Sequence, residues 1–344
     1  MLKPEQTIAL YMEGHVDSDY GKMGMGVIRY CSNPICCVID STQQGNTMDA
    51  FMPTKRNIPI VANLEAALEA GAEVLILGIA PSGGKIPETW IPVIEAALQA
   101  GLSLVNGLHD LIAPRWGALL QHPQQWIWDV RVPSFVPPIA TGRAATCGNR
   151  RVLLVGTDMA VGKMTTGLEL FSYLKNNGHQ VGFVATGQIG ITIMGKGIPL
   201  DAFKVDHACG AVETAVLEQQ EDWVIIEGQG SLLHPGSTAT LPLMRGSCPT
   251  DLILCHRAGK ERLRSPEHIR VPDLKAFIAL NEDLCTVVGT FPQAKVRGIA
   301  VNTSTLTEAA ARDYLAAVSK KTGIVAVDPV RFSIDPLAKA LLSA

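Results

Sequence analysis

The sequence predicts an α/β fold made of two domains, each with a parallel sheet covered by helices. Strand and helix patterns alternate along both halves of the chain, an order typical of parallel sheets with helices on both faces. At 344 residues the chain is long enough for two separate cores. A segment rich in Pro, Gly, Thr and Ala divides the two series. We therefore expect a first domain over 1–140, a linker over 141–150 and a second domain over 151–344.

The first half contains short apolar runs of the length expected for buried strands: Ile8–Tyr11, Cys36–Ile39, Ile58–Val61, Glu73–Ala80 and Leu102–Val105. Helices are expected between them, one capped by Asn63 and ended by Gly71, and another over 88–100. The run Trp126–Trp128 predicts an edge strand or a packing patch.

The glycines of the segment 21–26, GKMGMG, lack the spacing of a dinucleotide-binding fingerprint, and we expect a flexible loop there. Two other polar loops, 80–85 and 106–110, directly follow expected strands. Because ligands of such sheets bind at the carboxyl ends of the strands, these two loops lie on the favoured edge.

The motif that organises the second half is the segment 151–166, RVLLVGTDMAVGKMTT. An apolar run, Val152–Val155, enters a glycine-bounded loop, and a helix that continues to about Lys175 follows. A loop of this shape directs backbone N–H groups and the positive end of a helix dipole into one small space that suits a phosphate. We expect a phosphate-bearing ligand to be held by Gly156, Thr157, Asp158, Val161, Gly162, Lys163, Met164, Thr165 and Thr166.

This loop departs from the standard P-loop pattern in two ways. Five residues, not four, separate its glycines, and Met164 follows the lysine where Ser or Thr is usual. A hydroxyl at that position normally binds Mg²⁺, and a thioether is a poor ligand for a hard cation. The loop is therefore expected to bind phosphate, while Mg²⁺-assisted transfer of a γ-phosphate is disfavoured.

The rest of the second half continues the alternation, with strands expected at Val181–Ala185, 222–227, Asp251–Cys255, Arg297–Asn302 and Gly323–Val327. Glu227 stands at the tip of its strand, where P-loop proteins carry an acidic residue, and is expected to be a functional carboxylate. His234 follows in the next loop, either as a proton acceptor or as a loop residue without a role. Asp206 precedes an expected helix over 208–217, either as its cap or as a catalytic carboxylate.

A basic cluster is unusual for this chain: Arg245, Arg257, Lys260, Arg262 and Arg264. It forms either a solvated surface or a site that recognises a carboxylate or phosphate through fork-shaped guanidinium groups.

Composition limits the class of partner. The formal net charge is −3 and aromatic residues are only 5%, so neither a nucleic acid nor a membrane surface is expected as a partner. The N-terminus lacks a signal-peptide pattern, and the eight cysteines form no zinc-ligand spacing. We expect a cytoplasmic protein that acts on a small-molecule substrate, holds no metal and forms a homo-oligomer.

Five segments together resemble one known family: GTDMAVGKMTT, VATGQIGI, IIEGQGSLLHPG, DLILCHRAGK and VRGIAVNTS. The resemblance covers nearly the whole chain and is to the D-glutamate N-acetyltransferase family, long classed as a family of unknown function. It implies a Rossmann-like first domain and a P-loop NTPase-like second domain of the dethiobiotin-synthetase type. It also implies transfer of an acetyl group from acetyl-CoA to the amino group of an acidic D-amino acid such as D-glutamate.

Under this resemblance the loop holds the pyrophosphate of acetyl-CoA without hydrolysing it, so no Mg²⁺ ligand is needed. The base candidates are Glu227, His234 and Asp206, in that order, and the backbone N–H groups of 228–231 are the expected oxyanion donors. In dethiobiotin-synthetase-like folds an asparagine at the place of Asn302 contacts the adenine. The residues expected to hold the substrate are Gln188, Gln229, Arg245 and Arg257.

Two other functions are compatible with these residues. The first is an ATP- and Mg²⁺-dependent ligase or kinase resembling dethiobiotin synthetase, with Glu227 and Asp158 supporting the metal and Thr165 replacing the missing hydroxyl. The second is a nucleotide-sensing switch protein, which would bind with little turnover and change shape over 188–197.

Overall fold

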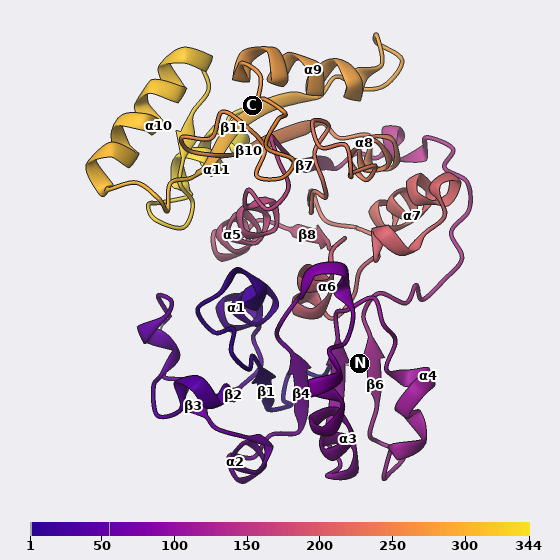
Figure 1. Cartoon of the computed structure of the whole chain (residues 1–344). Coiled ribbons are helices and arrows are strands. Elements are labelled where there is room, and N and C mark those ends of the chain that lie inside the picture. Colours follow the sequence, from indigo (N-terminus) through magenta and orange to yellow (C-terminus); the bar gives the residue numbers. More distant parts are fainter. Residues whose placement is uncertain (1, 55) are drawn as a thin grey trace. The chain divides into compact units, whose positions relative to one another are not determined.

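The structure is a computed structural model that describes residues 2–54 and 56–344, and the chain forms two compact units (Figure 1). The first unit contains the chain up to Pro133 together with Gln188–Pro199, and the second contains Ser134–Gly187 and Leu200–Ala344. Each unit has a parallel sheet with helices packed against it, which confirms the predicted α/β class. Within the described residues, no helix combines the length and the apolar run that a bilayer crossing requires.

The sheet of the first unit has the strand order β3-β2-β1-β4-β5-β6, and all its described pairings are parallel. This order reverses at the β1–β4 boundary, as in Rossmann-like sheets. Its strands are β1 (Ile8–Tyr11), β2 (Ile35–Ile39), β3 (Ile60–Val61), β4 (Val74–Leu77), β5 (Ser103–Asn106) and β6 (Ile127–Asp129). Its helices are α1 (Lys22–Tyr30), α2 (Leu64–Glu69), α3 (Ile91–Gln99), α4 (Ala113–Trp116) and α6 (Gln188–Met194).

The GKMGMG segment is a helix, so the loop expected there is wrong. Residues 22–30 form α1, which packs beside β4 and α6. A Cβ atom on Gly24 would lie 2.3 Å from the sulfur of Met12, so glycine is required for this close approach. The packing of a glycine face against the sheet outweighs the low helix propensity of glycine. The Trp126–Trp128 run, in contrast, does contribute to an edge strand, β6.

The sheet of the second unit has the strand order β12-β11-β10-β7-β9-β8, again with parallel pairings. Its strands are β7 (Arg150–Gly156), β8 (Val181–Val184), β9 (Trp223–Ile226), β10 (Asp251–Arg257), β11 (Lys295–Asn302) and β12 (Ala326–Val327). Its helices are α5 (Lys163–Asn176), α7 (Val205–Leu217), α8 (Thr240–Ser247), α9 (Leu274–Thr286), α10 (Glu308–Thr322) and α11 (Asp335–Leu342). The central strand β7 delivers the phosphate loop to the carboxyl edge of this sheet.

The segment before β7 packs against α7 of the second unit. The buried carboxylate of Glu213 accepts hydrogen bonds from the backbone N–H groups of Thr141 (3.1 Å) and Arg143 (2.7 Å). A Cβ atom on Gly210 would lie 1.7 Å from the carbonyl oxygen of Pro138. Part of the segment expected to be a linker, 141–150, is therefore fixed to this unit, and Arg150 is already the first residue of β7.

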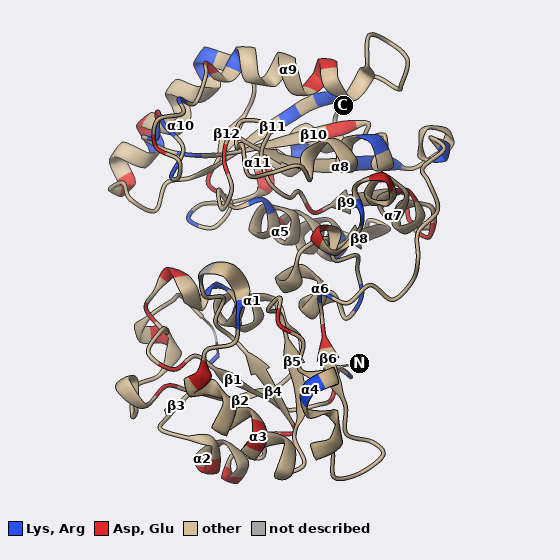
Figure 2. Cartoon of the chain, turned by 45° about the vertical axis from the view of Figure 1, so that its right-hand side comes forward, with Lys and Arg blue, Asp and Glu red and all other residues tan. Residues whose placement is uncertain are grey.

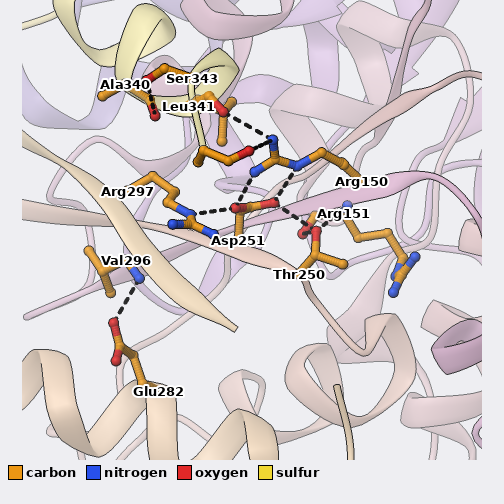
Figure 3. A network of polar contacts seen from close by, with 11 residues as sticks. Arg150, Arg151, Thr250, Asp251, Glu282, Val296, Arg297, Ala340, Leu341 and Ser343 are labelled. Carbon is orange, nitrogen blue, oxygen red and sulfur yellow. Dashed lines mark hydrogen bonds and ion pairs between the residues drawn. The ribbon is translucent and has the colours of Figure 1, made fainter. Parts of the chain in front are cut away.

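The amino edge of the second sheet carries a closed network of charges (Figure 3). The carboxylate of Asp251 accepts hydrogen bonds from Arg150 Nε (3.0 Å) and Nη2 (2.5 Å), from Arg297 Nε (2.7 Å) and from Thr250 Oγ1 (2.7 Å). Arg150 Nη1 also donates to a backbone oxygen of Ala344 (3.0 Å). Figure 2 shows acidic and basic segments side by side at this end of the sheet, close to the C-terminus.

Candidate functional site

The phosphate loop joins β7 to α5 through two residues with positive φ. Ala160 has φ +54° and Gly162, the N-cap of α5, has φ +103°. A left-handed conformation is costly for an alanine, and such strain is commonly retained where a backbone is shaped for a ligand. The conformation and position of this loop at the N-terminus of a 14-residue helix suit an anion.

Lys163 is a buried cation in this loop. Its Nζ donates a hydrogen bond to the carbonyl oxygen of Asp158 at 2.9 Å, and the residue is only 6% exposed. Burial lowers the pKa of Lys163 to about 8, although the charges of Cys255, Asp158 and Glu227 act in the opposite direction. The ammonium group is therefore charged near neutral pH and forms its described hydrogen bond with a neutral acceptor, which a phosphate oxygen could replace.

Asp158 fixes the shape of the loop with both carboxylate oxygens. Oδ1 accepts a hydrogen bond from Met159 N (2.7 Å), and Oδ2 accepts one from Arg264 N (2.8 Å). These contacts tie the phosphate loop to the segment that follows β10. A role of Asp158 in supporting Mg²⁺ would have to use the remaining lone pairs of these two oxygens.

Glu227 lies immediately after β9, at the same edge of the sheet. Its Oε2 accepts hydrogen bonds from the backbone N–H groups of Thr186 (2.8 Å) and Gly187 (3.1 Å), and no described residue donates one to Oε1. The side chain is buried, and burial raises the pKa of Glu227 to about 7 despite these two donors and the nearby Lys163. This carboxyl group can therefore both lose and accept a proton near neutral pH.

Glycines allow the strands to bring these groups together. A Cβ atom on Gly228 would lie 1.7 Å from the carbonyl oxygen of Leu154 and 2.9 Å from Cδ of Lys163. The Lys163 side chain thus runs directly past the tip of β9. A Cβ atom on Gly187 would lie 2.2 Å from Nε2 of Gln229 and 3.1 Å from Oε1 of Glu227, so both side chains closely approach Gly187, three residues after β8.

Arg257, the last residue of β10, lies at the same carboxyl edge of the sheet. Its Nη2 donates a hydrogen bond to the carbonyl oxygen of Ala160 (2.9 Å), while its Nε is buried without a partner among the described residues. An orphaned buried donor against the phosphate loop fits a ligand that brings an acceptor there. Arg257 lies opposite Asn302 in the β10–β11 register, so both expected binding residues reach the same region.

Two residues expected to bind substrate lie elsewhere. Arg245 is in the last turn of α8, just before β10 begins at the amino edge, and its guanidinium lies 5.5 Å from the centre of the Phe291 ring. Gln188 begins α6 in the first unit, where its Cγ would lie 3.2 Å from a Cβ on Gly107. The structure therefore does not bring Arg245 to the phosphate loop, and the role of Gln188 stays a prediction.

His234 and Asp206 have surroundings unlike those of Glu227. Nε2 of His234 lies 2.5 Å from the carbonyl oxygen of Ser265, and its Nδ1 accepts a hydrogen bond from Gly236 N at 3.1 Å. Both ring nitrogens are thus engaged by the backbone, which favours the loop role over the role of base. Asp206 is exposed in the first turn of α7, whose N-cap is Lys204, so the expectation that Asp206 caps the helix is wrong.

The backbone donors expected over 228–231 are reduced by one. Ser231 N donates to Ser237 Oγ (3.3 Å), so the expected oxyanion donors that remain are Gly228, Gln229 and Gly230, and their role stays a prediction. Among the described residues, no group of three His, Cys, Asp or Glu side chains is arranged to hold a metal ion.

Sequence reasoning missed a buried polar chain beneath the loop. Thr157 Oγ1 lies 2.9 Å from His256 Nδ1, and His256 Nε2 lies 3.0 Å from the hydroxyl of Tyr314. Burial lowers the pKa of His256 to about 4, so the ring is neutral and relays hydrogen bonds without carrying charge. The position of His256 near the end of a strand beside the phosphate loop was the available signal.

Comparison with known proteins identifies the family. The C-terminal P-loop domain of the family of unknown function DUF1611 matches residues 138–338, and the N-terminal Rossmann-like domain of the same family matches residues 41–133. The chain is 46% identical to a DUF1611 family protein from Anabaena variabilis of known crystal structure, with a TM-score of 0.95 over 99% of this chain and 100% of that one.

Two relatives carry a functional name. A D-glutamate N-acetyltransferase from Tritonibacter scottomollicae is 40% identical over 81% of this chain and 84% of the relative. A D-glutamate N-acetyltransferase from a Pseudoalteromonas species is 36% identical over 80% of this chain and 83% of the relative. These matches extend over both domains and confirm the resemblance inferred from the motifs, so the chain belongs to the DUF1611 family, with its N-terminal Rossmann-like and C-terminal P-loop domains.

Proposed function

We propose that this protein is an N-acetyltransferase that transfers the acetyl group of acetyl-CoA to the amino group of D-glutamate. The names of its two relatives support this reaction. The observation that carries it is the buried carboxyl group of Glu227, which has an available oxygen and lies at the tip of the strand beside the phosphate loop. An amine that attacks a thioester must lose a proton, and a carboxylate whose pKa is about 7 suits that step.

The phosphate loop has the groups needed to bind a pyrophosphate without cleaving it. Lys163 supplies a buried positive charge next to the loop backbone. Met164 stands where a Mg²⁺-binding hydroxyl is usual, so neutralisation of the phosphates falls to the protein cations. Acetyl-CoA, when bound, supplies the activated acetyl group.

Residues directly after β8 and β9 then carry out the acid–base chemistry. Oε1 of Glu227 accepts the proton of the acceptor ammonium group, while Thr186 N and Gly187 N hold Oε2 and fix the orientation of the carboxylate. The free amine then forms the C–N bond with the acetyl carbon, the C–S bond breaks, and the CoA thiolate leaves and takes up a proton. In this proposal, the backbone N–H groups of Gly228, Gln229 and Gly230 stabilise the oxyanion at the same edge. We assign the Gln229 amide, which like Oε1 of Glu227 approaches Gly187, to donate a hydrogen bond to a carboxylate of the acceptor.

The decisive experiment is calorimetric titration of acetyl-CoA and of ATP, each with and without Mg²⁺. We expect Mg²⁺-independent binding of acetyl-CoA, weakened on the order of 100-fold in Lys163→Ala because a charge-assisted contact is lost. Lys175→Ala removes an exposed lysine from the other end of the same helix and should bind like the wild type. Mass spectrometry should then detect N-acetylglutamate with D-glutamate as acceptor.

Other results would favour the remaining functions. Binding of ATP alone, strengthened by Mg²⁺, would replace the transferase with a ligase or kinase. Tight nucleotide binding without product would favour a switch protein. Size-exclusion chromatography of the same preparation tests the predicted homo-oligomer. The eight free cysteines suit a reducing compartment, and we propose the cytoplasm.

A further inference from the structure

A hollow beside the phosphate loop is lined by an excess of positive charge. Four of its lining residues belong to the loop, and the rest come from the end of β10 and the segment after it: Thr157, Asp158, Met159, Val161, Arg257, Lys260, Arg262, Arg264 and Val271. Four cationic side chains thus face one carboxylate, that of Asp158. Both oxygens of this carboxylate already accept backbone hydrogen bonds. The local excess of positive charge contrasts with the whole chain, whose net charge is −3.

The segment that carries these charges is a built part of the fold. Leu263 N bonds to the carbonyl oxygen of Ile269 (2.9 Å), and Val271 N bonds to that of Glu261 (2.8 Å). Leu263 is buried, and Arg264 N is bound to Asp158 Oδ2. These contacts hold residues 261–271 as a folded-back loop whose basic side chains remain next to the phosphate loop.

The position of this segment in the sheet indicates which part of a ligand it would meet. Ala258 N donates to the carbonyl oxygen of Asn302 (3.0 Å), so the segment leaves the sheet between the phosphate loop of β7 and the tip of β11. A nucleotide whose pyrophosphate lies in the loop and whose base reaches Asn302 has its ribose between these two places. The orphaned Nε of Arg257 lies in this same region.

We infer that the segment formed by residues 257–264 recognises a phosphate on the ribose, the 3′-phosphate that distinguishes coenzyme A from ATP and ADP. This inference rests on the proposed function. Lys163 is placed for the pyrophosphate, and the additional cations match a second, separate phosphate group. A phosphate monoester carries close to two negative charges at neutral pH, so several cations around it are stabilising. The protein thereby selects its acetyl donor by the ribose phosphate.

The experiment compares calorimetric titrations of acetyl-CoA and acetyl-3′-dephospho-CoA. We expect acetyl-CoA to bind the wild type roughly 10- to 100-fold more tightly, the range for one or two charge-assisted hydrogen bonds. In Lys260→Ala/Arg262→Ala the two ligands should bind with nearly equal affinity, at the level of the dephospho ligand in the wild type. The control Lys275→Ala/Lys320→Ala removes two exposed lysines from α9 and α10 and should retain the full difference.

Each other outcome has a distinct meaning. Equal binding of both ligands to the wild type would overturn this inference and leave the proposed function standing. A double variant that binds acetyl-CoA normally but has a raised KM for D-glutamate would also overturn it, because the segment would then hold the acceptor carboxylates. Failure of both ligands to bind the wild type would sink the proposed function itself.

Discussion

Buried charges are paired at the amino edge of the second sheet and lack ion-pair partners in hydrogen-bond contact at its carboxyl edge. At the amino edge, Asp251 is 1% exposed and accepts hydrogen bonds from two arginines and a threonine, so its charge is fully matched. At the carboxyl edge, Lys163 donates to a neutral carbonyl, Glu227 accepts from two backbone amides, and Arg257 Nε has no partner among the described residues.

This difference separates groups that hold the fold from groups available to a ligand. A buried charge that is paired can be removed only with a loss of stability, since its partners are then left without a counter-charge. A buried charge without an ion-pair partner in hydrogen-bond contact already destabilises the native state, and its pKa moves toward neutrality. Burial raises the pKa of Glu227 to about 7 and lowers that of Lys163 to about 8. Both shifts reflect the free-energy cost of burying a charged group. Such residues cluster where proteins do chemistry.

The largest effect is expected from Glu227→Gln. Loss of the base should lower kcat about 10²- to 10⁴-fold, the usual contribution of a positioned general base. The dissociation constant of acetyl-CoA should change little, because the amide retains the shape that Thr186 N and Gly187 N hold. Steady-state kinetics and titration of the same preparation measure both quantities.

The matched control is Glu218→Gln, which removes an exposed carboxylate at the end of α7 and should leave kcat unchanged. A Glu227→Gln variant with nearly normal kcat would exclude Glu227 as the base. The carboxyl edge would then differ from the amino edge in charge pairing alone, without a link to catalysis.

The next effect is a loss of stability at the amino edge. Asp251→Asn leaves Arg150 and Arg297 without their shared counter-charge, and we expect the free energy of unfolding to fall by roughly 3–5 kcal/mol. Calorimetric unfolding should show this loss in the transition of the second unit. Asp313→Asn, at an exposed position on α10, is the control.

The same variant should bind acetyl-CoA with wild-type affinity at temperatures where it is folded. A loss of affinity in folded Asp251→Asn would show that the two edges are coupled, and it would break the separation argued above.

The sequence was sufficient to predict the elements that share the carboxyl edge. Strand tips of a parallel sheet meet at one edge, so the phosphate loop and Glu227 could be placed together from their positions after apolar runs. The unusual Met164 was also visible directly. Local patterns of this kind need no knowledge of long-range packing.

Other features depend on contacts far apart in the chain. The helix at 22–30 exists because glycines approach Met12, and His234 is engaged because its ring meets the carbonyl of Ser265. Arg245 was grouped with Arg257 by charge, but α8 carries it to the opposite edge, and no motif marked that helix. The link from Thr157 through His256 to Tyr314 likewise joins three separate elements.

The smallest effect, and the sharpest comparison of the two edges, is the pH dependence of stability. Burial raises the pKa of Glu227 in the native state to about 7, above its ordinary value of 4.5. The stability linked to this group is therefore fully present below pH 4.5 and is lost as the pH rises to 7, where a buried carboxylate must form. Glu227→Gln cannot ionise, so its advantage over the wild type should grow from zero at pH 4.5 to at most about 3 kcal/mol at pH 8.

Denaturant unfolding of both proteins at a series of pH values measures this difference, and titrating groups that do not interact with Glu227 cancel in the comparison. Lys163 remains mostly protonated until about pH 8, and its attraction to the carboxylate reduces the gain in the variant. At pH 8 the two carboxylate-to-amide substitutions should thus change the free energy of unfolding in opposite directions: Glu227→Gln should raise it and Asp251→Asn should lower it. A destabilised Glu227→Gln at pH 8 would mean that its carboxylate is as well matched as that of Asp251, and the distinction between the edges would fail.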